Sequence, residues 1–145
     1  MGGNRRMKQI NYLEYSEYNE IICRLIYEYN ISSQIKVIFI AFSIKNNISN
    51  FKFTSQKYGA LDIILSGIKL GLRRGVSDFA IIFDCLNLLK RAGFILEQNG
   101  LIEQLKHPRY SKELDCLNSQ VVRRAINEAE KLSDESIIRG VMQYV

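Results

Sequence analysis

The chain has 145 residues, of which 47% are hydrophobic and 24% are charged, and it carries a formal net charge of +5 with an isoelectric point near 9.2. This length suits one domain, and the balance of apolar and charged residues excludes a disordered or collagen-like chain. No apolar stretch reaches the roughly 18 residues that cross a bilayer, and the amino terminus lacks the apolar segment of a signal peptide, so we expect a cytoplasmic protein that does not enter a membrane.

The amino-terminal part is expected to combine a flexible basic lead, residues 1–10, with an amphipathic helix. Apolar residues in segment 19–29 recur at intervals of three and four, which places them on one helical face. That face consists of Ile22, Leu25, Ile26 and Tyr29, and the opposite, polar face of Glu20, Arg24 and Glu28. Residues 11–145 are expected to form a single domain that includes this helix.

The next two segments are expected to belong to the core. Residues 35–44, IKVIFIAFSI, are apolar almost throughout, a pattern that fits a buried strand as well as a buried helix. Residues 55–72 have the spacing of a second helix, in which Gly67 and Gly71 lie one turn apart. Glycine costs about 1 kcal/mol relative to alanine in a helix interior, so we expect another backbone to pack closely against this pair.

Residues 77–104 are expected to form a helix followed by a β-hairpin. Ser77 is a suitable N-cap, and Gly93 suits the position after a helix, where the backbone often has a positive φ. Apolar and polar residues then alternate on both sides of Asn99 and Gly100, a pair that favours a tight hairpin turn. This order of elements is typical of a winged helix-turn-helix protein.

The carboxyl-terminal part is expected to be helical. Asn118 or Ser119 is expected to begin one helix and Ser133 a second, after a polar loop that contains the only proline. The predicted fold is therefore α+β and mainly α. It has a winged helix-turn-helix-like core with a short β-hairpin wing and C-terminal helices.

Cysteine and histidine do not suggest a metal site or a disulfide framework. The three cysteines share no CxxC spacing, and two of them lie within apolar runs, so we interpret them as buried small apolar residues. They are Cys23, Cys85 and Cys116. His107 is the only histidine, and Pro108 follows it, which places it in a loop without further metal ligands. We therefore expect no metal and no cofactor.

The sequence also lacks the common catalytic signatures. It contains none of the motifs GxxxxGK[ST], GxGxxG, GxSxG and HExxH, which mark many nucleotide-binding proteins and hydrolases. An enzyme would need residues such as Asp62, Asp84 or His107 to converge, and their spacing gives no reason for that. We therefore expect a protein that is not an enzyme and has no small-molecule substrate.

The basic composition leaves nucleic-acid binding open, because lysine and arginine displace counterions from phosphates. The helix at residues 77–92 would enter the major groove, but its polar arc consists only of Ala80, Asp84, Asn87 and Arg91. The carboxylate of Asp84 would repel phosphates rather than contact base edges. Nonspecific phosphate contact remains open for Lys69, Arg73, Arg74, Lys90 and Arg91.

Several segments together resemble a known family of bacterial proteins. They are YSEYNEIICRLIYEY, IKVIFIAFSI, SDFAIIFDCLNLLKRAGFI and the hairpin that follows. Over residues 15–102 their pattern and order are similar to the middle component of bacterial ABC three-component systems, encoded between an SMC-like ABC ATPase and an effector, as in Lamassu-type defence. The resemblance implies a non-catalytic adaptor that joins the ATPase to a nuclease or other toxic effector and restrains it until foreign or aberrant DNA is sensed.

The expected partners are therefore an SMC-like ABC ATPase and an effector, with nonspecific DNA contact as part of the complex. Apolar residues exceed what a small winged helix needs for its own core, and large exposed apolar patches mark interaction sites. The candidate interface residues are Ile81, Leu88, Ile137, Ile138, Val141, Met142 and Tyr144. The alternative is a winged-helix DNA-binding transcriptional regulator, with residues 77–92 as recognition helix and residues 94–105 as wing.

Overall fold

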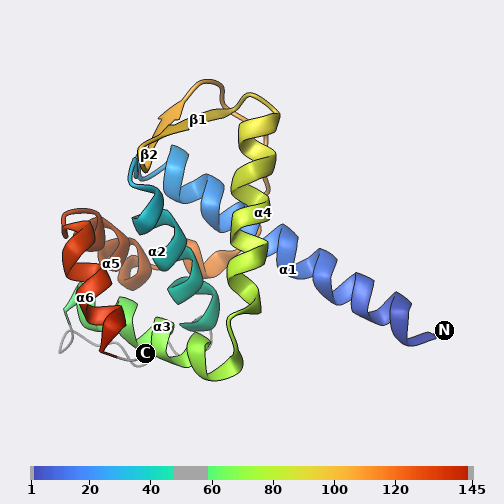
Figure 1. Ribbon diagram of the computed structural model, residues 1–145, viewed down its shortest axis with the longest axis horizontal. Helices are drawn as coiled ribbons and strands as arrows, with labels where there is room; N and C mark the ends of the chain where they lie inside the picture. The colour runs from blue at the N-terminus through green and yellow to red at the C-terminus, as the bar shows by residue number, and fades with distance from the viewer. Residues whose placement is uncertain (1, 48–58, 144–145) are drawn as a thin grey trace.

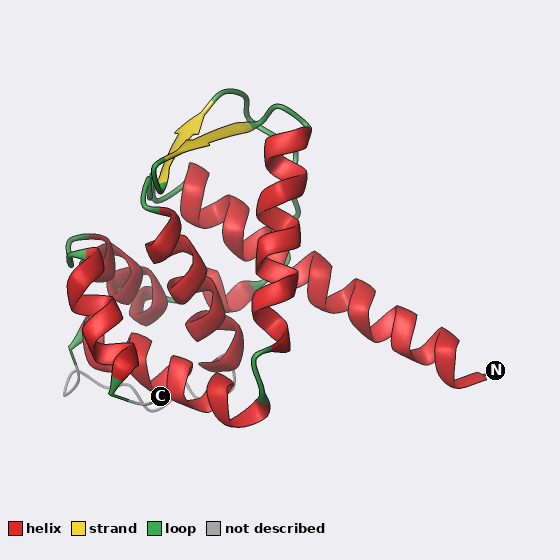
Figure 2. Cartoon of the chain, viewed as in Figure 1, coloured by secondary structure: helices red, strands yellow, loops and turns green. Residues whose placement is uncertain are grey.

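The computed structural model describes residues 2–47 and 59–143 of the chain (Figure 1). This part is mainly helical and contains one two-stranded antiparallel sheet, as predicted (Figure 2). Its elements in chain order are α1 (Gly2–Tyr27), α2 (Gln34–Asn47), α3 (Ala60–Arg74), α4 (Ser77–Arg91), β1 (Ile95–Gln98), β2 (Leu101–Gln104), η2 (Asp115–Asn118), α5 (Gln120–Glu130) and α6 (Asp134–Met142).

Helix α1 is longer than the sequence predicted. It begins at Gly2, so residues 2–10, for which we expected a flexible lead, form helical turns. The first half of α1 projects away from the other elements, while its second half passes behind α4 (Figure 1). In that second half Tyr18, Ile21 and Leu25 are fully buried. Apolar spacing therefore located only the part of the helix that the core covers.

Helix α2 is packed against five other helices, and it settles the ambiguous segment 35–44 as helical. Its neighbours are α1, α3, α4, α5 and α6. Side chains all round α2 are buried, among them Val37, Ile40, Phe42 and Ile44. A helix that is covered on every side has no polar face, so its sequence shows neither the helical nor the strand period.

The two glycines of α3 lie against α2, as predicted. A Cβ atom at Gly67 would be 2.5 Å from the carbonyl oxygen of Ser43, and one at Gly71 would be 2.7 Å from Nδ2 of Asn46. The hydroxyl of Ser43 also donates to the carbonyl oxygen of Ile64 at 2.7 Å. The predicted close approach of a backbone is therefore confirmed at Gly67, whereas Gly71 makes room for the side chains of Phe42 and Asn46.

Helix α4 starts without the predicted cap and ends with the predicted one. Ser77 is its first helical residue. The N-cap position is occupied by Val76, whose side chain makes no capping hydrogen bond. At the other end Gly93 has φ 78°. The N–H groups of Gly93 and Phe94 donate to the carbonyl oxygens of Lys90 and Leu89 at 3.1 and 3.0 Å. This is a Schellman motif, and it turns the chain directly into the hairpin.

The hairpin has the predicted turn and register. Asn99 and Gly100 have φ values of 53° and 81°, as a two-residue type I′ turn requires. The strands pair with Gln98 opposite Leu101. The backbone N–H of Ile102 donates to the carbonyl oxygen of residue 32 at 2.6 Å, which attaches the hairpin to the segment just before α2.

Helices α5 and α6 pack on α3 and α2 and so belong to the same core. The hydroxyl of Ser33 donates to the carboxylate of Asp134 at 2.8 Å, and the ammonium of Lys36 donates to the carbonyl oxygen of Glu130 at 2.5 Å. Ser133 caps α6, as predicted. These contacts join the amino-terminal end of α2 to the turn between α5 and α6.

Candidate functional site

Two tyrosines of α1 hold α4 in place. The hydroxyl of Tyr15 donates to the carboxylate of Asp84, and that of Tyr18 donates to Asp78, each at 2.6 Å. The thiol of Cys85 lies 3.8 Å from the carbonyl oxygen of Tyr15. Burial and the hydrogen bond to Asp78 raise the pKa of Tyr18, so this tyrosine stays a donor. Both acidic residues of α4 are therefore engaged with α1.

The other flank of α4 packs against α2. The ring of Phe79 stacks on Phe42 with the centroids 4.2 Å apart and meets the edge of Phe39 at 6.1 Å. One face of α4 remains exposed, and it carries Ala80, Phe83, Asp84, Asn87, Leu88 and Arg91. The polar arc that the sequence predicted is thus exposed, but two large apolar side chains accompany it.

The predicted phosphate-contact residues form two groups, one before α4 and one at its end. Four of them are exposed: Lys69, Arg73, Arg74 and Arg91. The ammonium of Lys90 is partly exposed and lies 3.9 Å from the carboxylate of Glu97. Because α4 spans 15 residues, about 22 Å at 1.5 Å per residue, it separates the two groups. The structure does not bring these residues into one basic patch.

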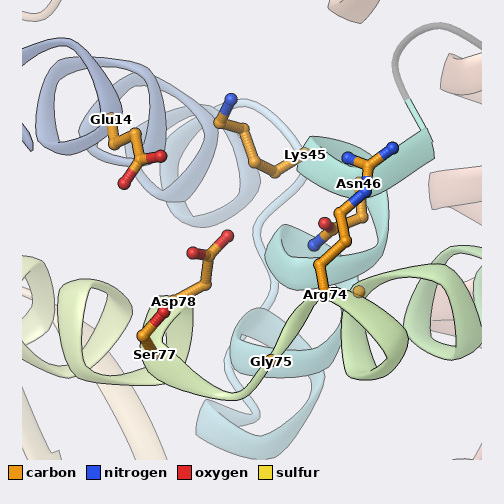
Figure 3. A pocket seen from close by; sticks show the side chains of 8 residues that line it. Glu14, Lys45, Asn46, Arg74, Gly75, Ser77 and Asp78 are labelled. Atoms are coloured by element: carbon orange, nitrogen blue, oxygen red, sulfur yellow. The ribbon is translucent and has the colours of Figure 1, made fainter. Parts of the chain in front are cut away.

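A polar cavity of about 270 Å3 opens at the turn between α3 and α4 (Figure 3). Its lining consists of Glu14, Lys45, Asn46, Gly71, Arg74, Gly75, Ser77 and Asp78. Several of these groups have partners of their own: the ammonium of Lys45 is 2.6 Å from the carboxylate of Glu17, and the amide of Asn46 donates to the carbonyl oxygen of Phe42. The cavity therefore mixes both charge signs, and it lies where the middle of α1 meets the end of α2, the end of α3 and the start of α4.

The outer face of the hairpin carries three exposed leucines beside the polar side chains of Gln98 and Glu103. Strand alternation places Leu96, Leu101 and Leu105 on this face, where they are 41%, 61% and 51% exposed. Ile95 and Ile102 lie on the inner face and are buried. The turn carries no basic side chain. The position of the hairpin was predicted correctly, but its three leucines were not among the candidate interface residues, although their alternation was the available signal.

Three of the predicted interface residues belong to the chain's own core. Ile81, Ile137 and Val141 are buried, so they line the core of the chain and not the exposed surface on which we expected them. The reason is that α4 packs on α1 and α2, and α6 packs on α3 and α2. The α6 contact is close, since a Cβ atom at Gly140 would lie 2.7 Å from the side chain of Leu65.

The other interface candidates are exposed where the structure describes them. Leu88 on α4 is 60% exposed, and Ile138 and Met142 on α6 are 38% and 67% exposed. Ile138 and Met142 lie one turn apart and so share a face of α6. Tyr144 lies outside the described residues. The exposed apolar area on α6 is therefore smaller than predicted.

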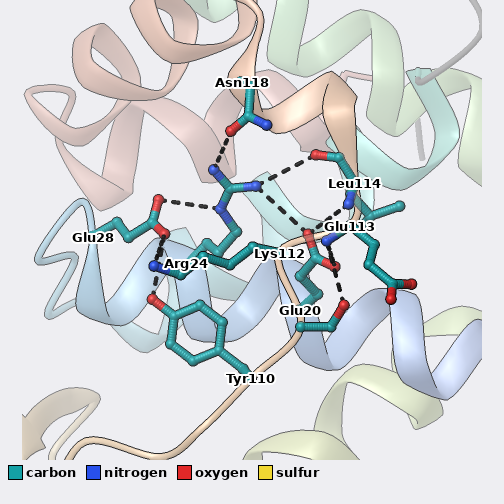
Figure 4. Close-up of polar contacts among 9 residues, drawn as sticks. Glu20, Arg24, Glu28, Tyr110, Lys112, Glu113, Leu114 and Asn118 are labelled. Atoms are coloured by element: carbon teal, nitrogen blue, oxygen red, sulfur yellow. Dashed lines mark hydrogen bonds and ion pairs between the residues drawn. The ribbon is translucent and has the colours of Figure 1, made fainter.

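A buried ionic network, which was not predicted from the sequence, joins the segment before η2 to α1 (Figure 4). The guanidinium of Arg24 contacts Glu28 at 3.1 Å, Asn118 at 2.7 Å and Glu20 at 3.5 Å. The carboxylate of Glu20 accepts the backbone N–H of Leu114 at 2.9 Å. Arg24 and Glu20 belong to the polar face that the sequence predicted for this helix, yet they are only 4% and 2% exposed. Their spacing of four residues was the only signal.

The residues considered for catalysis do not converge. Asp84 contacts Tyr15, whereas the ring of His107 lies 4.9 Å from that of Tyr27. These two tyrosines are twelve residues apart on α1, about 18 Å along the helix axis. Asp62 lies on α3. Within the described residues no group of three histidine, cysteine, aspartate or glutamate side chains could hold a metal ion.

The cysteines are free thiols, and two are buried as predicted. Burial raises the pKa of Cys23 to about 12 and that of Cys85 to about 11. Cys116 is half-buried, and burial raises its pKa as well. Because the thiolate is the reactive form, these pKa values make the buried cysteines poor nucleophiles.

Comparison of the chain with family models, with curated proteins and with solved structures gives no match. Among the helices that the structure describes, none has the length and apolar character needed to cross a bilayer.

Proposed function

We propose that the chain is a non-catalytic accessory subunit of a bacterial anti-phage or anti-plasmid defence complex, in which it links an SMC-like ABC ATPase to an effector such as a nuclease. The resemblance over residues 15–102 supports the choice of partners. The order of α3, a short turn, α4 and the hairpin, with the hairpin attached to the segment before α2, supports a winged-helix core.

The observation that carries this proposal is a pair of separate apolar surfaces. One is the hairpin surface, formed by Leu96, Leu101 and Leu105, and the other is the α6 surface, formed by Ile138 and Met142. The carboxyl end of α6 points away from the hairpin (Figure 1), while its first residue, Asp134, is linked through Ser33 to Leu101 of the hairpin. Exposed apolar side chains gathered on one face favour protein contacts, and two such surfaces let one small protein hold two partners.

A DNA-binding regulator is the second candidate, because Lys69, Arg73 and Arg74 are exposed directly before α4. The exposed face of α4 argues against sequence-specific binding. Asp84 and Leu88 occupy it, whereas readout of base edges relies mainly on arginine, lysine, asparagine and glutamine. DNA contact through the α3 cations would be nonspecific and would weaken steeply with salt.

Co-expression with the products of the neighbouring genes, followed by size-exclusion chromatography, tests the adaptor function. We expect the chain to elute with an SMC-like ATPase and an effector. Leu101→Asp should release one partner and Met142→Asp the other, whereas Val121→Asp on α5 should release neither. Truncation of α6 is unsuitable, because Ile137 and Val141 belong to the core.

Two results would overturn the adaptor function in favour of the regulator. One is a chain that elutes alone while both neighbours are present. The other is nanomolar binding to one short DNA site at physiological salt. Under the adaptor function, replacing both Arg73 and Arg74 by glutamate weakens the residual DNA binding to a similar extent on all sequences.

A further inference from the structure

The exposed face of α4 has the layout of a helix–helix contact. Ala80, Asp84, Asn87 and Arg91 follow one another at intervals of four, three and four residues, and they form a stripe along the exposed side. This is the spacing of the seam between two packed helices. Phe83, 46% exposed, and Leu88, 60% exposed, flank the stripe on its two sides. Helices α1 and α2 pack on the buried side of α4, and α1 reaches the stripe only at Asp84, through the hydroxyl of Tyr15.

The charges on this stripe complement a second copy of the same stripe. Asp84 and Arg91 lie two helical turns apart, with Asn87 and Leu88 midway between them. If a second α4 lies antiparallel, with a two-fold axis passing near Asn87 and Leu88, each Asp84 faces the other copy's Arg91. In a parallel pair, by contrast, like charges would meet.

We propose that α4 forms a symmetric antiparallel contact with α4 of a second copy of the chain, held by two Asp84–Arg91 ion pairs and by the apolar flanks Phe83 and Leu88. The contact is isologous, so it closes on a dimer and does not extend into a filament. It goes beyond the proposed function and does not depend on it, because the hairpin and α6 surfaces stay outside the α4 contact.

The projecting half of α1 also supports a second copy of the chain as the partner of α4. It emerges from behind α4 and stands clear of the other elements (Figure 1). Tyr12 and Leu13, at the base of this projection, are 81% and 62% exposed, and Tyr15 joins α1 to Asp84 beside the stripe. A helical segment this short is marginal in water unless something packs against it. A second copy seated on α4 would lie next to this projection.

Sedimentation equilibrium of the purified full chain, over a range of concentrations, tests the dimer. We expect the wild-type chain to be a dimer at micromolar concentration. Asp84→Arg alone and Arg91→Asp alone each bring like charges together and should raise the dissociation constant at least tenfold. The double variant Asp84→Arg, Arg91→Asp reverses both charges and should restore the dimer.

Matched controls distinguish loss of the α4 contact from unfolding and from a change in net charge. Tyr15→Phe removes the hydrogen bond to Asp84 without changing its charge and should leave the dimer intact. Arg73→Asp changes the net charge as Arg91→Asp does, but on α3, and should also leave the dimer intact. Circular dichroism checks that each variant is folded. A monomeric wild-type chain, single variants that remain dimeric, or a double variant that remains monomeric would each overturn the proposal, whatever the outcome of co-expression with partners.

Discussion

Neighbouring residues of α4 meet opposite environments. Leu86 is 1% exposed and faces α1 and α2, whereas the next residue, Asn87, is on the exposed face. A rotation of 100° per residue is enough to carry a side chain from core to solvent. The loss in free energy of unfolding that a substitution causes therefore depends on whether the residue lies on the buried or the exposed side of α4, even for residues next to each other in the sequence.

Leu86→Asp should strongly destabilise the folded protein, because it buries a carboxylate that has no partner. The expected loss is several kcal/mol, against a total free energy of unfolding of about 5–15 kcal/mol. Urea denaturation followed by circular dichroism measures the difference, with Asn87→Asp as the control that adds the same group on the exposed side. If the two variants unfold at the same urea concentration, the assignment of the α4 faces is wrong.

The segment between β2 and α5 is held to the rest of the structure largely by the side chain of Arg24. It contains only the short η2 helix, and Arg24 and Glu20 of α1 fasten it through Asn118 and the backbone of Leu114. The two i,i+4 pairs of Arg24 are buried or half-buried, unlike surface pairs, which contribute little. Removing one partner of a buried pair leaves the other charge without compensation.

Arg24→Met should therefore lower the free energy of unfolding by about 3–5 kcal/mol and loosen residues 105–119, because Glu20 would keep a buried charge without its cation. Arg124→Met is the control, since Arg124 forms an exposed i,i+4 pair with Glu128 at 3.3 Å and should cost less than about 1 kcal/mol. Chemical denaturation gives both values, and limited proteolysis reports the loosening. Equal costs for the two variants would contradict a structural role for the network.

The molecule as a whole protects two thiols from water. Cys23 on α1 and Cys85 on α4 are buried, and their pKa values are about 12 and 11. An unfolded chain would ionise the same thiols near pH 9. The folded state thus binds these protons more tightly than the unfolded state. The resulting stability is fully present below pH 9 and is lost as the pH rises through the folded pKa values.

The free energy of unfolding should accordingly fall above pH 9, by about 1.4 kcal/mol per thiol for each pH unit up to the folded pKa. The double variant Cys23→Ala, Cys85→Ala should show a shallower decline, even if its stability at pH 7 is lower. Urea denaturation at a series of pH values between 7 and 11 measures both slopes. Parallel profiles for the two proteins would show that these thiols do not control the alkaline loss.

The hairpin, the end of α4 and the start of α6 could be predicted because local chemistry determines them. Asn99 and Gly100 accept the left-handed backbone of a type I′ turn, Gly93 accepts the positive φ after α4, and Ser133 caps α6. The close packing at Gly67 was also predictable, because an unfavourable residue inside a helix requires a compensating contact. Each of these features depends on a few neighbouring residues and their backbone preferences.

Only the tertiary structure decided which apolar and charged side chains are covered. The segment 35–44 is a helix because five others surround it, and Ile137 and Val141 are core residues because α6 docks on α3. Arg24 is buried because a segment ninety residues later in the chain folds over it. Composition and spacing indicate which side chains favour burial. Which element buries them depends on contacts between distant parts of the chain.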